Sequence, residues 1–254
     1  MRTNFHTHTM RCNHADGTDR AYVEAAIKSG IKVLGFSDHV PYSAFPDPTY
    51  YSFFRMKPTL TEDYCNSILQ LKEAYKADIE IRLGFEAEYY PEMFGELLDF
   101  LKPYPYEYLL LGQHCVGKEY DNPWWSSHPT ADAAILKRYV DQTIAGMQTG
   151  AFAYLCHPDL FYFTGDDAVY RQEMQRICEA ALQLDMPLEC NLLGFRAMRN
   201  YPDPRFFCLA AEYGCKVILG IDAHGPAEID HPKNAGIHQF LADCGVTNIV
   251  EDFK

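Results

Sequence analysis

Short apolar runs alternate along the chain with longer segments in which apolar residues recur at three- and four-residue spacing. The short runs are typical of strands buried in a parallel sheet, and the longer segments are typical of amphipathic helices. Their repeated alternation predicts an α/β protein. The expected strands lie within residues 2–8, 32–39, 79–89, 106–116, 152–160, 186–194 and 215–224.

The segments between these strands predict helices, for example within residues 20–30, 60–77 and 130–150. Gly30, Gly150 and Gly214 follow helical patterns and are expected to end them in the left-handed conformation. The longest irregular segment, residues 40–58, is rich in proline and aromatic residues. A connection of this length predicts either a functional loop or a surface loop packed by its own side chains.

The composition limits the class of protein. A chain of 254 residues suits one α/β barrel, so we expect a single domain over residues 1–254. The absence of a long apolar run or a signal-peptide pattern favours the cytoplasm and disfavours a membrane protein. The nine cysteines include no C-x-x-C pair and are expected to be reduced and mostly buried. A formal charge of -13 argues against an extended nucleic-acid interface.

Side chains that bind metals stand at the ends of most predicted strands. They are His6, His8, His39, Glu86, His114, His157, Asp222 and His224, and His14 follows the first strand closely. The carboxyl ends of strands in a parallel barrel meet at one mouth, so we expect these residues to converge. One such histidine alone is more often a satisfied polar residue, but burying so many imidazoles without partners would be costly. The set therefore predicts a metal centre.

Alternation along a strand refines this prediction. Residues two apart face the same side, which pairs His6 with His8 and Asp222 with His224. The neighbours Asp38, Cys115 and Cys156 are expected to face away, as packing or supporting residues. We expect the remaining histidines, His128, His231 and His238, to lie at the surface.

Two glutamates compete for one role. Glu86 and Glu88 share a strand face, so either could bridge two metals. Glu86 is favoured because it follows "LGF" at the end of the strand. Glu88 is then expected to contact substrate or to orient a ligand.

The motifs "HTH", "FSDH", "LGQH" after "GFEAE", "CHPD" and "GIDAH" resemble those of the PHP (polymerase and histidinol phosphatase) metal-dependent phosphoesterases over essentially the whole chain. Within that family the chain is most similar to the monofunctional histidinol-phosphate phosphatases of histidine biosynthesis, through "HTHTMRCNHADG", "SDHVP", "HPDLF" and "LECNLLGFRAMRNYPDP". The resemblance implies a distorted TIM-like (β/α)7 barrel. It also implies three divalent metal ions, which zinc, iron or manganese would suit alike.

Carried over residue by residue, the resemblance assigns ligands to each metal. The first would take His6, His8, Glu86 and Asp222; the second Glu86, His114 and His157; the third His14, His39 and His224. Glu86, His114 and Asp222 are expected to be the catalytic ligands.

The reaction expected from this resemblance is hydrolysis of a small phosphorylated substrate by a metal-activated water. Arg196 is the first choice for a residue that clamps the phosphate, and Arg199 and Arg20 are alternatives. If the substrate is histidinol phosphate, Glu88 and the aromatic residues from Tyr42 to Phe54 could hold its cationic end.

Other interpretations stay open. An amidohydrolase would also begin with an H-x-H strand, but the extra His14, His39 and His224 and the lack of a lysine at a strand end argue against it. The chain could instead be a non-catalytic metal-binding accessory module, or could hydrolyse another phosphomonoester or a nucleotide. The sequence gives no indication of the oligomeric state.

Overall fold

Parallel strands form the framework of the chain, as the apolar runs predict. The computed structural model describes residues 1–42 and 52–253. Contacts within the chain divide it into two units. Unit 1 comprises Met1–Ala87, Pro91–Leu110 and Gly220–Pro232, and unit 2 comprises Glu88–Tyr90, Leu111–Leu219 and Lys233–Lys254.

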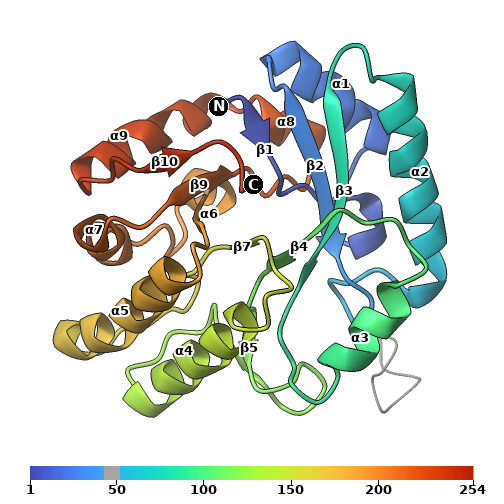
Figure 1. The fold of residues 1–254 in the computed structure, drawn as a ribbon. Coiled ribbons are helices and arrows are strands. Elements are labelled where there is room, and N and C mark those ends of the chain that lie inside the picture. The colour runs from blue at the N-terminus through green and yellow to red at the C-terminus, as the bar shows by residue number, and fades with distance from the viewer. Residues whose placement is uncertain (43–51, 254) are drawn as a thin grey trace. The chain divides into compact units, whose positions relative to one another are not determined.

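Unit 1 contains the first strands of the chain and the helices that follow them (Figure 1). The strands β1 and β2 pair in parallel, as do β2 and β3, and β4 follows β3 in the sheet. Helix α1 begins at the N-cap Thr18 and ends at Gly30, which is left-handed as predicted. The elements of unit 1 are β1 (Thr3–Asn4), α1 (Asp19–Ser29), β2 (Val33–His39), α2 (Thr61–Ala74), β3 (Glu80–Ala87), α3 (Phe94–Leu101), β4 (Tyr108–Leu111) and α8 (Pro226–Ile229).

A buried tyrosine links segments of unit 1 through hydrogen bonds. The hydroxyl of Tyr108 lies 2.8 Å from the carbonyl oxygen of Phe5 and 3.0 Å from that of Phe36. The ring fits there because Gly35 and Gly84 have no side chain: a Cβ would approach Tyr108 to 2.2 Å at Gly35 and to 2.5 Å at Gly84. Close approach, not a turn, therefore explains these two glycines inside strands.

Unit 2 holds the later strands and a short hairpin. Leu155 of β7 pairs in parallel with Leu188 of β8, and β9 pairs in parallel with β10. Strands β5 and β6 pair antiparallel. The strands of unit 2 are β5 (Cys115–Val116), β6 (Trp124–Trp125), β7 (Tyr154–Leu155), β8 (Leu188–Asn191), β9 (Val217–Gly220) and β10 (Ile249–Val250).

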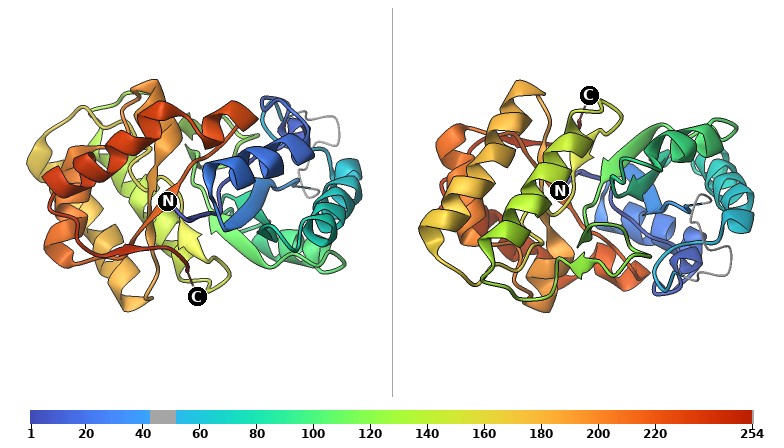
Figure 2. Two further views of the ribbon diagram at one scale, coloured as in Figure 1. Left: turned by 90° about the horizontal axis from the view of Figure 1, so that it is seen from above. Right: turned by 90° about the horizontal axis from the view of Figure 1, so that it is seen from below.

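The helices of unit 2 pack in sequence order, α4 against α5 and α5 against α7 (Figure 2). Their N-termini are capped by Asp132, Asp166 and Asp203, whose carboxylates accept hydrogen bonds from the first turns. The helices are α4 (Ala133–Met147), α5 (Asp167–Gln183), α6 (Leu192–Ala197), α7 (Pro204–Tyr213) and α9 (Ile237–Asp243).

The predicted elements agree with this structure except in detail. Each of the seven predicted strand segments contains a strand, and β6 and β10 were not predicted. Gly214 ends α7 as expected, whereas α4 ends at Met147, three residues before Gly150, which has a left-handed φ of 70°. Of the proline-rich segment 40–58, residues 43–51 lie outside the described part of the chain. Within the described residues, no helix has the length and apolarity needed to cross a membrane.

Candidate metal centre

The backbone brings the two ends of unit 1's sequence together. The Asn4 side chain accepts a hydrogen bond from the Ile221 N–H at 2.8 Å, and Thr7 forms a parallel bridge with Ala223. The His8 N–H donates to the Ala223 carbonyl at 2.9 Å. His6 and His8 therefore lie beside Asp222 and His224, although more than 200 residues separate them in sequence.

Strand register brings in a second pair. His39 at the end of β2 is the direct partner of Glu86 on β3. Its Nδ1 lies 3.0 Å from Glu86 Oε2. The Ser37 N–H donates to the Thr7 carbonyl at 2.9 Å, which aligns this end of β2 with the segment that carries His6 and His8.

Two carboxylate oxygens form the centre of the resulting cluster. Glu86 Oε2 lies 3.4 Å from His6 Nε2 and 3.5 Å from His8 Nε2, in addition to its contact with His39. Asp222 Oδ1 lies 3.5 Å from His6 Nε2 and 3.1 Å from His8 Nε2. Both carboxylates are buried. Each oxygen is thus shared by several imidazoles, which is the arrangement expected around cations.

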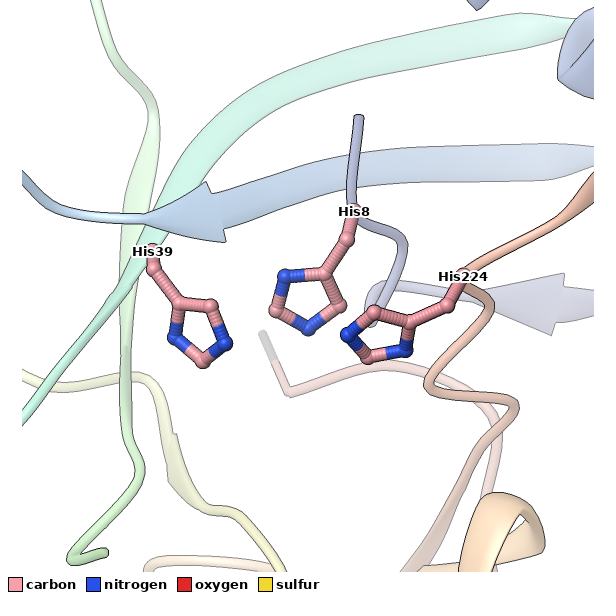
Figure 3. A group of neighbouring side chains, drawn as sticks. All are labelled: His8, His39 and His224. Atoms are coloured by element: carbon pink, nitrogen blue, oxygen red, sulfur yellow. The ribbon is translucent and has the colours of Figure 1, made fainter. Parts of the chain in front are cut away.

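The third part of the cluster consists of neighbouring imidazole rings. His8 lies between His39 and His224, with ring centroids 4.3 and 4.1 Å away, and Figure 3 shows the three rings drawn from three separate segments. The ring of His14 lies 4.5 Å from that of His224 and 5.4 Å from that of His39. His14 is the exposed member of the group, and its Nδ1 lies 2.8 Å from the Cys12 carbonyl oxygen.

The charges in this cluster displace the pKa values of its members. Burial lowers the pKa of His8, but the nearby carboxylates of Asp222 and Asp38 outweigh burial and raise it to about 9. Burial and the neighbouring His8 lower the pKa of His224 to about 3 and also lower that of His14. Burial would raise the pKa of Asp222, but His6 and His8 hold it well below its usual value.

The donor set fits divalent metal ions. Ligand atoms of His8, His39 and His224 lie within 4.8 Å of one another, as do those of His6, His8 and Asp222. Both ring nitrogens of His8 and the Nε2 of His224 are buried without a hydrogen-bond partner among the described residues. Asp222 adopts a φ of 50°, a conformation that non-glycine residues hold only when their surroundings impose it. Imidazole and carboxylate together suit zinc, iron and manganese.

Unit 2 contains a smaller cluster of similar chemistry. The rings of His114 and His157 are 5.0 Å apart. His114 Nδ1 is 2.6 Å from Glu88 Oε1, and Glu88 is fully buried. The backbone N–H of His157 donates to Glu189 Oε2 at 3.1 Å, and His157 has a φ of 27°. Glu88 therefore lies against a histidine ring, whereas Glu86 Oε2 lies near three imidazoles.

The candidate phosphate-binding arginines differ in their surroundings. Arg196 was expected just past the sixth strand and lies on α6, where it is buried and donates to Asn234 Oδ1 at 3.3 Å. Arg199 is exposed and donates to the Tyr201 hydroxyl at 3.2 Å. Arg20 lies on α1 and donates to Tyr75. Among these three, Arg196 alone has the buried position of a binding-site residue.

Two buried acidic residues beside the histidines were harder to predict from the sequence. Glu189 is fully buried, accepts a hydrogen bond from Asn191 Nδ2 at 3.0 Å, and was not singled out. Its signal was a charged residue inside the apolar run "MPLECNLL", where burial requires a partner. Asp38, expected to face away from His39, is also fully buried. The remaining histidines are peripheral: His128 and His238 are exposed, and His231 is partly exposed.

The parallel α/β framework and the imidazole–carboxylate cluster define a metal-binding α/β protein. The chain matches the family model described as PHP domain over residues 4–192, and it belongs to that family. It is 31% identical to a probable histidinol-phosphatase of Deinococcus radiodurans over 88% of this chain and 86% of the relative. It is 36% identical to the histidinol-phosphatase of Bacillus subtilis over 40% of this chain and 39% of that protein.

Solved structures establish the fold. The chain is similar to histidinol phosphate phosphatase from Lactococcus lactis, crystallised with zinc, L-histidinol and phosphate, with a TM-score of 0.72 and 19% identity over 98% of this chain and 95% of the other. It resembles equally the putative histidinol phosphatase from Listeria monocytogenes, with a TM-score of 0.71 and 19% identity over 92% of this chain and 99% of the other. The predicted fold class, a distorted TIM-like barrel of the PHP type, is confirmed.

Proposed function

We propose that this chain is a metal-dependent phosphomonoester hydrolase that converts L-histidinol phosphate and water to L-histidinol and phosphate, in histidine biosynthesis. The observation that carries the proposal is the cluster in unit 1, where Glu86 and Asp222 are shared by histidines from separate segments. Membership of the PHP family and the relatives named histidinol-phosphatase support the substrate. The ligands in the Lactococcus lactis structure agree with it.

The proposal includes three divalent ions, of zinc, iron or manganese. The ligands in unit 1 are His6, His8, His14, His39, Glu86, Asp222 and His224, and those in unit 2 are His114 and His157. Contacts of Glu86 Oε2 with three histidines support Glu86 as the bridging carboxylate. The single domain over residues 1–254 and the cytoplasmic location also belong to the proposal, and the nine free cysteines support that location.

When bound, the divalent ions would supply Lewis-acid chemistry: they would lower the pKa of a water and neutralise phosphate charge. The residues of the chain hold and orient the reacting groups. Glu86, His114 and Asp222 are proposed to act at the reacting centre. Glu88 keeps the Nδ1 of His114 occupied, so that only the Nε2 lone pair is available to a metal ion. Arg196 is proposed to bind the phosphate oxygens.

The test is phosphate release by the purified protein from L-histidinol phosphate, p-nitrophenyl phosphate and a panel of nucleotides and sugar phosphates. A kcat/KM for histidinol phosphate well above those for the other esters is expected, with loss of activity after chelation and recovery on adding metal. A preference for another ester would change the substrate and keep the reaction class.

Two outcomes would overturn the proposal. Hydrolysis of amides or rings without phosphatase activity would indicate an amidohydrolase. Protein that binds metal fully and hydrolyses no phosphoester would indicate an accessory metal-binding module.

A further inference from the structure

Asp38 is a buried carboxylate beside the unit 1 cluster that is not one of its proposed ligands. It lies on β2 next to His39 and is fully buried. No lysine or arginine contacts it among the described residues. A buried carboxylate without a lysine or arginine partner is costly, so its presence calls for a compensating role.

Neutral donors hold this carboxylate in one orientation. The Thr9 hydroxyl donates to Asp38 Oδ2, and the His39 N–H donates to Asp38 Oδ1 at 2.8 Å. The Asp38 N–H in turn donates to the Tyr64 hydroxyl at 3.3 Å, and that hydroxyl donates to the Gly84 carbonyl at 2.8 Å. Two strands and helix α2 thus fix the position of Asp38.

The fixed carboxylate faces one edge of the His8 ring. Asp38 Oδ1 lies 3.6 Å from His8 Nδ1. The opposite nitrogen, His8 Nε2, faces Asp222 Oδ1 at 3.1 Å and Glu86 Oε2 at 3.5 Å. A carboxylate on one side of an imidazole favours a hydrogen on the nearer nitrogen, which leaves the farther nitrogen with its lone pair.

We propose that Asp38 is a positioning residue that sets the tautomer and orientation of His8, so that Nε2 is presented to a metal ion together with Glu86 and Asp222. This inference rests on the proposed function, because it assumes that the cluster binds metal. It parallels the contact of Glu88 with His114 in unit 2. Loss of a carboxylate in this role is expected to weaken metal binding by about 10- to 100-fold.

The experiment is a titration of metal-free protein with Co²⁺. Calorimetry measures the affinity, and the visible absorption of the bound ion reports its coordination. We expect Asp38→Asn to bind the ion of the unit 1 cluster about 10- to 100-fold more weakly than wild type and to change the absorption bands. The thermal midpoint of the metal-free variant is expected to stay close to that of wild type. Asp19→Asn is the matched control, because Asp19 is a nearly buried carboxylate of unit 1 that binds Arg11 and Ser67.

Each outcome separates the alternatives. Unchanged Co²⁺ affinity and absorption in Asp38→Asn, even with a lower thermal midpoint, would mean that Asp38 only supports the backbone. The inference about Asp38 would then be wrong, and the proposed function would not be affected. Wild-type protein that binds no Co²⁺ would overturn the proposed function as well. If Asp38→Asn does not fold, Thr9→Val removes the donor to Oδ2 and is expected to weaken binding in the same direction by a smaller factor; unchanged binding there would also contradict the inference.

Discussion

The histidine clusters of the two units differ in how they use carboxylates. In unit 1, one oxygen each of Glu86 and Asp222 lies within 3.5 Å of at least two imidazoles. In unit 2, Glu88 contacts the ring of His114, and Glu189 accepts a hydrogen bond from the backbone N–H of His157. We call these two carboxylates dedicated because each supports one histidine of unit 2. Shared carboxylates are suited to bridging cations, whereas dedicated carboxylates are suited to orienting ligands. The comparison therefore separates the carboxylates proposed to bind metal from those proposed to orient the ligands.

The largest effect is expected from removing a shared charge. Glu86→Gln keeps the size of the side chain but takes away the negative oxygen that three histidines face. We expect metal content to fall and kcat/KM for histidinol phosphate to drop by more than about 100-fold. Metal analysis of the purified variant and steady-state kinetics measure both. Full metal content with wild-type kinetics would show that Glu86 does not bridge.

A dedicated carboxylate should matter less. Glu88→Gln preserves an acceptor oxygen for His114 Nδ1 but removes its charge, so we expect a loss of about 10- to 100-fold in metal affinity and a partial loss of kcat. Titration of the metal-free variant measures the affinity. If Glu88→Gln proves as severe as Glu86→Gln, the distinction between shared and dedicated carboxylates is wrong. If it raises KM alone, Glu88 contacts substrate.

Two arginines allow a similar comparison for substrate binding, because one is buried and the other is exposed. Arg196→Lys retains the charge of the buried residue but loses the planar donor pair, and we expect KM for histidinol phosphate to rise by about tenfold. Arg199→Lys, at an exposed position, is the matched control and should change KM little. If Arg196→Lys and Arg199→Lys change KM equally, the proposal that Arg196 binds the phosphate is wrong.

The smallest effects are pH-dependent and belong to unit 1 without metal. Because the pKa of His8 is raised from 6.5 to about 9, its stabilising contribution is present below pH 6.5 and is lost as the pH rises to about 9. The pKa of His224 is lowered to about 3, so its contribution is present above pH 6.5 and is lost as the pH falls to about 3.

Urea unfolding in the presence of a chelator, across this pH range, tests the two signs. The free energy of unfolding of wild type minus that of His8→Gln should decline between pH 6.5 and 9. The same difference for His224→Gln should decline between pH 6.5 and 3. Two differences that do not vary with pH would contradict the assigned charges.

The strand-end residues of unit 1 could be predicted because side-chain alternation and strand ends are local properties of the sequence. The sequence favoured Glu86 over Glu88 as the bridging carboxylate, and the contacts of both glutamates support that preference. The assignment of individual ligands to individual metals stays a prediction. It depends on side chains from distant segments, which no local pattern specifies.

Other features were beyond prediction for physical reasons. The strand expected over residues 106–116 ends at Leu111, so His114 follows a strand and not a continuous run through Cys115. His157 and Asp222 have positive φ values, and although aspartate and histidine adopt this conformation more often than most non-glycine residues, no local pattern identifies these two positions. Asp38 was placed on the side facing away from His39, but alternation could not reveal that it reaches His8 on another segment.

The side chain of Asn4 joins the start of the chain to Ile221, and this has a consequence for biosynthesis. The ribosome adds Asp222 more than 200 residues after His6 and His8. Until then the two histidines lack this carboxylate neighbour, so under the proposed function we expect the unit 1 cluster to bind its full set of metal ions only after Asp222 has emerged.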